Sequence, residues 1–175
     1  FPYTTLFRSV LDKSIYGEIL KDNGYFSAID PLKRINVAEN TYDLGEYLLD
    51  LYRRGKLDTR LGPVPGQMVY YPPCHLREQG VGMPYLDLLA GIPDISIETF
   101  KSTFYCCGIA GIMGFKHDFH KTSIQMGSRL MAKVRQLNPN YLITDCLSCR
   151  LQFNQMSAYP VQHPIEILKK SYEIY

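Results

Sequence analysis

The chain has 175 residues, of which 19 are lysine or arginine and 17 are aspartate or glutamate, so its formal net charge is only +2. This near balance excludes the basic footprint of a nucleic-acid-binding domain and the polybasic patch of a protein that binds membranes by charge. The length fits one compact domain with a sizeable core, and no run approaches the roughly 20 apolar residues of a membrane-spanning helix. We therefore expect any membrane association to depend on another subunit.

The first nine residues resemble an artificial sequence. Residues 1–9, F-P-Y-T-T-L-F-R-S, match the translation of a common sequencing adapter, and we expect them to be foreign to the protein. The remaining sequence begins near Val10 without a methionine, so we expect a fragment of a longer protein. We expect residues 10–62 to form a helical lead-in and residues 63–175 to form the main domain.

Helical periodicity dominates the lead-in. The stretch A-E-N-T-Y-D-L-G-E-Y-L-L-D-L-Y-R-R-G places Leu44, Leu48 and Leu51 on one face of a predicted helix, and Gly55 is its predicted stop. The G-P-V-P-G turn at 62–66 then ends the segment.

Strands and helices alternate in the main domain. We predict strands at Q-M-V-Y-Y, I-S-I-E-T and Y-L-I-T-D, and a last strand from Tyr159 to Gln162. Helices are predicted at M-P-Y-L-D-L-L-A-G, over Asp118 to Gln136, from Cys146 onward, and at H-P-I-E-I-L-K-K. Such alternation is typical of an α/β fold that has a mostly parallel sheet with helices on both faces.

The five cysteines lie at three places in the chain, namely Cys74, the adjacent pair Cys106 and Cys107, and the C-L-S-C motif of Cys146 and Cys149. Each group follows a predicted strand. Doubly wound folds bind their ligands outside the carboxyl ends of the strands. We therefore expect three loops to bring all five thiols to one site.

Several kinds of site use cysteines. Disulfides are disfavoured by the odd number of thiols and the lack of a secretory signal, and isolated buried cysteines would not cluster beside glycine loops. A C-x-x-C redox motif leaves the other three thiols unexplained. Zinc usually takes four ligands at short paired spacings, and two consecutive cysteines cannot easily face one small ion. An iron–sulfur cluster is therefore favoured, with zinc as the alternative.

The residues around the thiols support metal binding. Cys146 and Cys149 share one face at a helix start, where the helix N-terminus favours the thiolate. Gly108 and Gly111 follow the Cys-Cys pair, and we predict that they let the backbone pass close to the cluster and donate N–H groups to it. The alternative for both glycines is a tight turn.

Other polar residues near the motifs are assigned weaker roles. His75 supports the cluster or is a surface residue, while Lys116 and Arg77 balance cluster charge or are simply solvated. Asp145 is expected to cap the helix that follows it, and His163 is expected to be structural. None is expected to be catalytic.

Four segments resemble the cysteine-rich CCG domain of the heterodisulfide-reductase-related family: Y-Y-P-P-C-H-L-R, C-C-G-I-A-G-I-M-G-F-K, T-D-C-L-S-C-R-L-Q and H-P-I-E-I-L. The resemblance extends from about Val37 to the C-terminus. It implies that residues 10–62 end a preceding, truncated repeat and that residues 63–175 are the C-terminal CCG domain. It also implies a noncubane 4Fe–4S cluster with five ligands, Cys74, Cys106, Cys107, Cys146 and Cys149.

The resemblance implies an iron–sulfur electron-transfer subunit of an anaerobic respiratory dehydrogenase. Such a subunit takes electrons from a flavin-containing dehydrogenase subunit and passes them toward a membrane quinone or an anchor subunit, in the cytoplasm or at the inner face of the cell membrane. The chain lacks the first repeat and the ferredoxin-type cysteines of such proteins, so we do not expect catalysis by this chain alone. A disulfide reductase subunit and a structural zinc domain remain the alternatives.

Overall fold

The computed structural model describes residues 28–78, 80–100 and 105–174. The prediction for residues 1–9 and the first part of the predicted lead-in, up to residue 27, lie outside the described residues.

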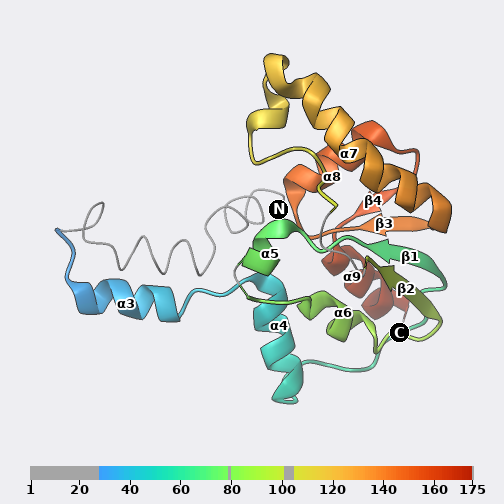
Figure 1. The fold of residues 1–175 in the computed structure, drawn as a ribbon. Helices are drawn as coiled ribbons and strands as arrows, with labels where there is room; N and C mark the ends of the chain where they lie inside the picture. The colour runs from blue at the N-terminus through green and yellow to red at the C-terminus, as the bar shows by residue number, and fades with distance from the viewer. Residues whose placement is uncertain (1–27, 79, 101–104, 175) are drawn as a thin grey trace.

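Within the described residues, four strands form one sheet at the centre of the molecule (Figure 1). They are β1 Gly66–Tyr70, β2 Ile95–Thr99, β3 Tyr141–Ile143 and β4 Val161–Gln162. Their order is β2-β1-β3-β4 and every pairing is parallel. The four predicted strands and the α/β fold with a parallel sheet are confirmed.

Helices cover both faces of the sheet, as predicted. Helices α4, α6 and α9 cover one face, and α7 and α8 cover the other (Figure 1). Helix α5 follows β1 directly, and the short 3-10 helix η1 precedes α7. The bounds are α3 Pro31–Glu39, α4 Leu44–Arg53, α5 Cys74–Glu78, α6 Pro84–Leu89, η1 Met113–Phe115, α7 His117–Leu137, α8 Leu147–Met156 and α9 Pro164–Ile174.

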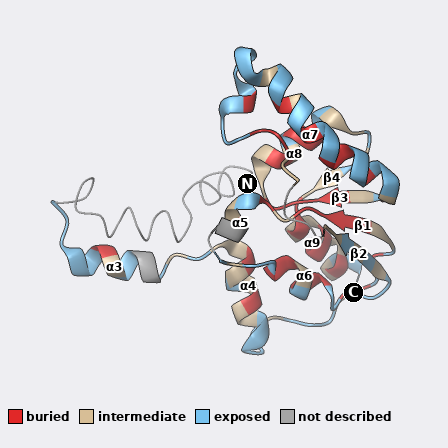
Figure 2. Ribbon diagram, in the orientation of Figure 1, coloured by how far each residue is buried: buried red, intermediate tan, exposed pale blue. Residues whose placement is uncertain are grey.

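Two hydrophobic cores flank the sheet, and β1 contributes to both. Its side chains alternate between the faces. Met68 and Tyr70 pack with α4, α6 and α9, whereas Val69 packs with α7 and α8. All three side chains are fully buried, which explains why β1 reads as a continuous apolar run (Figure 2).

The amphipathic stretch of the lead-in is divided, which corrects the prediction of one continuous helix. Asp43 interrupts it, because its carboxylate accepts hydrogen bonds from the backbone N–H groups of Gly45, at 2.8 Å, and Glu46, at 3.4 Å, and so begins α4. A side-chain cap of this kind competes with helix continuation. Leu49 is the leucine of this helix that is buried in the core, and Leu48 packs against the same core partly buried. Gly55, with φ of 66°, follows its end as predicted.

The strand order creates a switch point between β1 and β3. The chain leaves β1 toward β2 through α6 on one face, and leaves β3 toward β4 through α8 on the other face. Loops that diverge in this way open a crevice at the carboxyl ends of the two central strands. Cys74 and Cys146 stand at these two ends. Among the described residues, no helix is both long enough and apolar enough to cross a bilayer.

Candidate metal centre

Four of the five thiols are linked by hydrogen bonds at the carboxyl edge of the sheet, and Cys74 lies close enough for its charge to act on Cys106. Cys107 and Cys149 are buried and their sulfur atoms lie 3.0 Å apart, although the two residues are 42 positions apart in the sequence. Cys146 is hydrogen-bonded to Cys149 and to His75, which belongs to α5. The structure therefore brings the CCG loop, the C-L-S-C motif and the segment after β1 into contact.

The two remaining thiols belong to the same group. Cys106 accepts a hydrogen bond from the backbone N–H of Gly108 at 3.3 Å. Its pKa is raised first by a hydrogen bond with Cys107, then by burial, and also by the nearby charge of Cys74. The five thiols that the sequence predicts to converge thus form one interacting network.

Hydrogen bonds within the network favour two thiolates. The hydrogen bond from Cys106, together with that from Cys149, lowers the pKa of Cys107 to about 4. Contact with the Cys149 thiol, whose single proton lies between Cys107 and Cys146, and a hydrogen bond with His75 lower the pKa of Cys146 to about 5. The pKa of Cys149 is raised in turn, because it hydrogen-bonds Cys107 and Cys146 and is buried. Thiolates at neutral pH are the form in which cysteine ligates metal.

The thiols span a range of depth. Cys74 is exposed, Cys106 and Cys146 are half-buried, and Cys107 and Cys149 are buried. Among the described residues, no three His, Cys, Asp or Glu side chains stand around one point in a way that would hold a single ion. The donor set is entirely thiol, which is the ligand type of both iron–sulfur clusters and structural zinc, so the chemistry of these residues fits either group.

An aromatic wall closes the network on the side of the sheet. Tyr71 lies edge-on against Phe153, with ring centroids 5.2 Å apart, and its hydroxyl donates to the carbonyl oxygen of Tyr105 at 3.0 Å. Burial, followed by the charges of Cys149 and the other nearby thiols, raises its pKa. Tyr71 therefore stays a neutral phenol that shields the thiols from water. The Y-Y-P-P-C motif contains this tyrosine, but the alternation of strands and helices in the sequence does not reveal that Tyr71 packs against the thiols.

The two glycines of the CCG loop differ in their surroundings. Gly108 has φ of 94°, and a Cβ added to it would collide with the backbone oxygen of Ser123 in α7. Gly111 has φ of 67° and is open to solvent, with no heavy atom within 4 Å of an added Cβ. Gly108 therefore lies in the thiol network and is needed for close packing, while Gly111 lies in an exposed turn. A contact of either glycine with a cofactor stays a prediction.

Asp145 does not cap α8, which corrects the prediction for its carboxylate. The cap residue is Cys146, and no side chain caps that helix. The carboxylate is buried and instead accepts a hydrogen bond from the hydroxyl of Tyr70 at 3.3 Å. Burial raises the pKa of Asp145 to about 7. Sequence reasoning missed this pair because Tyr70 and Asp145 are 75 positions apart.

The remaining polar candidates are placed as follows. His163 is buried and its Nδ1 accepts a hydrogen bond from the N–H of Ile165 at 3.1 Å, so its predicted structural role at the start of α9 is confirmed. His75 touches the network through Cys146. Lys116 is exposed. The side chain of Arg77 lies outside the described residues.

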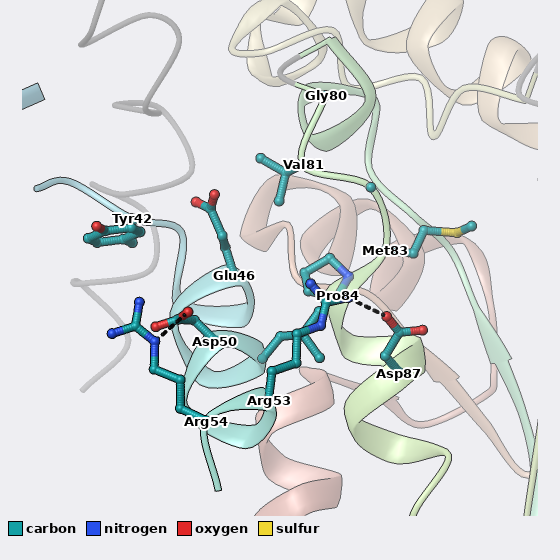
Figure 3. Close-up of a pocket in the computed structure, with 12 residues that line it drawn as sticks. Tyr42, Glu46, Asp50, Arg53, Arg54, Gly80, Val81, Met83, Pro84 and Asp87 are labelled. Carbon is teal, nitrogen blue, oxygen red and sulfur yellow. Dashed lines mark hydrogen bonds and ion pairs between the residues drawn. The ribbon is translucent and has the colours of Figure 1, made fainter. Parts of the chain in front are cut away.

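A separate hollow of about 450 Å³ lies between α4 and the segment that leads into α6 (Figure 3). Arg53 and Asp87 face each other across it at 3.5 Å, and Arg54 pairs with Asp50 at 2.9 Å. Its described lining contains no cysteine, so it is distinct from the thiol network.

Comparison with known proteins identifies the thiol region. Residues 68–154 match the family model of the cysteine-rich domain called CCG. The chain is 33% identical over 111 residues to a subunit of the anaerobic glycerol-3-phosphate dehydrogenase of Escherichia coli (strain K12), an alignment that covers 63% of this chain and 28% of that protein.

Two further relatives are named for other reactions. The chain is 28% identical over 146 residues to a subunit of the fumarate reductase (CoM/CoB) of Methanothermobacter marburgensis, covering 79% of this chain and 29% of that protein. It is also 28% identical over 133 residues to lactate utilization protein A of Anoxybacillus flavithermus, covering 75% and 52%. The chain thus spans under a third of the first two relatives and about half of the third. Residues 68–154, with the CCG loop and the C-L-S-C motif at one edge of the sheet, form a cysteine-rich domain of the CCG family.

Proposed function

We propose that this chain is part of an iron–sulfur electron-transfer subunit of an anaerobic respiratory dehydrogenase similar to the glycerol-3-phosphate enzyme. The observation that carries the proposal is the single network of five thiols at the switch point of a parallel sheet. In this proposal the network holds a noncubane 4Fe–4S cluster with five ligands, Cys74, Cys106, Cys107, Cys146 and Cys149.

A cluster at this place would supply reversible one-electron transfer. The chain's own residues would set the conditions for it. Cys107 and Cys149 lie in a hydrophobic core, which excludes water from one side of the thiols. The N–H of Gly108 already donates to Cys106, and hydrogen bonds to cluster sulfur atoms are one way in which proteins tune reduction potential. The exposed Cys74 would mark the side on which electrons enter or leave.

The relatives support a place in a larger complex. Two of them are named as subunits, one of a dehydrogenase and one of a reductase. We propose that the whole protein receives electrons from a flavin-containing dehydrogenase subunit and delivers them toward a membrane quinone or an anchor subunit at the inner face of the cell membrane. Substrate chemistry would then take place on the flavin subunit, and this chain would relay electrons.

A second candidate is a catalytic subunit that reduces a disulfide. The name of the Methanothermobacter relative, one subunit of a CoM/CoB reductase, favours it. Reduction of a small disulfide by the cluster-loaded full-length protein, with a reduced viologen dye as electron source, would support this candidate over the relay. A structural zinc domain is the third reading of the same five thiols.

The decisive experiment is to measure iron, acid-labile sulfide and zinc per chain on protein prepared without oxygen. We expect about four irons with matching sulfide, and much less of both in Cys107→Ala. Ser148→Ala is the matched control, because Ser148 lies between the two cysteines of the C-L-S-C motif and its loss should leave the iron content unchanged. About one zinc without sulfide would contradict the cluster and leave the structural zinc domain.

A further inference from the structure

An apolar surface lies immediately after the CCG loop. It consists of Ile112 just before η1, Met113 and Phe115 on η1, and Phe119 on the first turn of α7, and is called the apolar cap here. Ile112 is 69% exposed, Phe115 55% and Phe119 45%. Four large apolar side chains exposed within eight residues are unlike the single exposed apolar residues of an ordinary surface.

The apolar cap rests on a tightly held support. The N–H of Gly114 donates to the carbonyl oxygen of Ile109 at 2.8 Å. His120 meets the carbonyl oxygen of Gly114 at 3.2 Å, and the ring's other nitrogen meets the Gln155 side chain at 3.0 Å. Beneath the loop, Gly108 packs directly on the backbone of α7. The exposure of these side chains is therefore a property of a fixed loop, not of loose packing.

The apolar cap lies at the same edge of the sheet as the thiols. Helix α7 connects the parallel strands β2 and β3, so it must run back from their carboxyl edge to their amino edge. Its N-terminal turn, with Phe119, therefore stands at the carboxyl edge. Ile109, which holds η1, is two residues after Cys107. A protein seated on the apolar cap would thus lie beside the thiol network.

The charges around the apolar cap are positive. From Met113 to Leu137 the sequence has five lysine or arginine residues and one acidic residue, Asp118. Lys116 and Lys121 flank the apolar cap and are exposed. Neither takes part in an ion pair in the described part of the chain. The opposite layer differs, because its exposed charges form pairs such as Arg53 with Asp87 and Lys169 with Glu173.

We propose that the apolar cap and its basic rim dock a protein subunit that presents an apolar patch rimmed by carboxylates. This inference rests on the proposed function, and names the subunit that exchanges electrons with the thiol network as the occupant. An apolar centre with a charged rim is the usual anatomy of such interfaces. Opposite charges at the rim would steer the encounter and fix its orientation.

Two other occupants fit the surface less well. A membrane-bound helix needs an apolar face along its length, but the main apolar face of α7, with Leu130, Met131 and Val134, is buried in the core (Figure 2). A second copy of this chain would bring one basic rim against another, which is repulsive. Both occupants become outcomes of the test.

The test uses the full-length protein with its cluster, and the flavin-containing dehydrogenase subunit of the proposed complex as the probe. Phe115→Ser with Phe119→Ser is expected to raise the dissociation constant at least about tenfold. Lys116→Glu with Lys121→Glu is expected to slow association about tenfold at low salt, with little difference at high salt. Lys133→Glu with Arg135→Glu, at the far end of the same helix, is the matched control and should change both quantities less than about twofold.

Zero-length cross-linking of lysine amines to carboxylates supplies the position of the contact. Cross-links from Lys116 or Lys121 to acidic residues of the flavin subunit support the proposal. Unchanged binding of both variant pairs overturns it. It is also overturned if the phenylalanine pair is needed for binding to phosphatidylglycerol vesicles or for self-association of the protein, but not for binding to the flavin subunit.

Iron and sulfide content separates this inference from the proposed function. The four surface residues do not belong to the thiol network, so the variants should keep the cluster content of the wild type. A wild-type protein without iron and sulfide would contradict the proposed function, while the dissociation constants would still report on docking. Full cluster content with unchanged binding would contradict docking alone.

Discussion

The two faces of the sheet carry different kinds of chemistry. The layer of α7 and α8 holds Cys107 and Cys149 within its hydrophobic core and exposes the apolar cap and a row of basic residues. The layer of α4, α6 and α9 contains no cysteine in its core, and its exposed charges are largely paired. This difference indicates that one layer forms the site and its approaches, while the other supports the sheet from behind.

The buried polar residues follow the same division. Tyr70, which packs in the supporting layer, donates to Asp145 just before the first cysteine of the C-L-S-C motif. The rings of Tyr85 and His163 are edge-on to each other, with centroids 5.4 Å apart. His163 also hydrogen-bonds the backbone of Asp145. The supporting layer thus holds the residue before Cys146 through hydroxyl and imidazole groups, while the core of the other layer contains Cys107 and Cys149.

The largest expected effect breaks the packing of the thiol layer. Gly108→Ala should lower the free energy of unfolding by roughly 4 kcal/mol, because φ is positive there and the new Cβ would collide with the backbone of Ser123. Gly111→Ala is the matched control. It also has a positive φ but open surroundings, so its cost should be about 1 kcal/mol. Chemical denaturation of both variants checks this, and equal losses would show that the close contact is absent.

The next effect separates the two cores. Leu130→Ala and Leu89→Ala each truncate a fully buried leucine, so each should lower the free energy of unfolding by roughly 3 kcal/mol. Only Leu130 shares a core with Cys107 and Cys149, so only its variant should also take up less iron. Denaturation and iron analysis of the two variants measure this, and the same iron loss in both would remove the functional distinction between the layers.

A smaller effect depends on pH and lies in the supporting layer. Burial, with the nearby charge of Arg150, lowers the pKa of His163 to about 3 from its usual 6.5. Between these values the unfolded chain binds the proton and the folded chain does not, so this residue costs stability as the pH falls. Between pH 7 and pH 5 the cost should be about 2 kcal/mol.

His163→Asn tests this expectation, since asparagine can still accept the hydrogen bond from Ile165 but does not titrate. The free energy of unfolding of the reduced, cluster-free chain is measured across this pH range for both proteins. The variant should lose about 2 kcal/mol less than the wild type. Parallel curves would mean that His163 is not buried in its neutral form.

The smallest effect concerns two tyrosines of the supporting layer, for which removal of the hydroxyl should change the free energy of unfolding in opposite directions. The hydroxyl of Tyr85 is buried and has no hydrogen-bond partner among the described residues, so Tyr85→Phe should raise the free energy of unfolding by up to about 1 kcal/mol. Tyr70→Phe should lower it by about 1 kcal/mol, because it removes the donor to Asp145. Thermal unfolding of both variants and the wild type measures these changes. A loss of stability in Tyr85→Phe would point to an ordered water bound to that hydroxyl.

Most of the fold could be predicted from local patterns. Strong signals lie within short stretches of sequence. They are the continuous apolar run of β1, the alternation of β2, and the apolar residues that recur every three or four positions in α7. The stop at Gly55 and the structural role of His163 also depend only on neighbours in sequence. The convergence of the thiols could be predicted because parallel sheets gather the carboxyl ends of strands at one edge.

Features that depend on distant contacts could not be predicted. The division of the lead-in helix at Asp43 is different, because its carboxylate bonds the nearby N–H groups of Gly45 and Glu46, a local capping signal that the periodicity of the leucines masked. Asp145 looked like a helix cap in sequence, but Tyr70 reaches it across the sheet. Nothing near Gly108 in sequence shows that α7 passes against it.

The contact between Cys107 and Cys149 has a consequence for the order of folding. It closes a loop of 42 positions that includes all of α7 and β3, so the complete set of thiols exists only after this long segment has folded back on the sheet. Closure of such a loop lowers conformational entropy before the free energy of metal binding can offset that loss. Metal uptake is therefore expected to follow folding of the sheet, and thereafter to stabilise it by mass action, since the unfolded chain does not present the five thiols together.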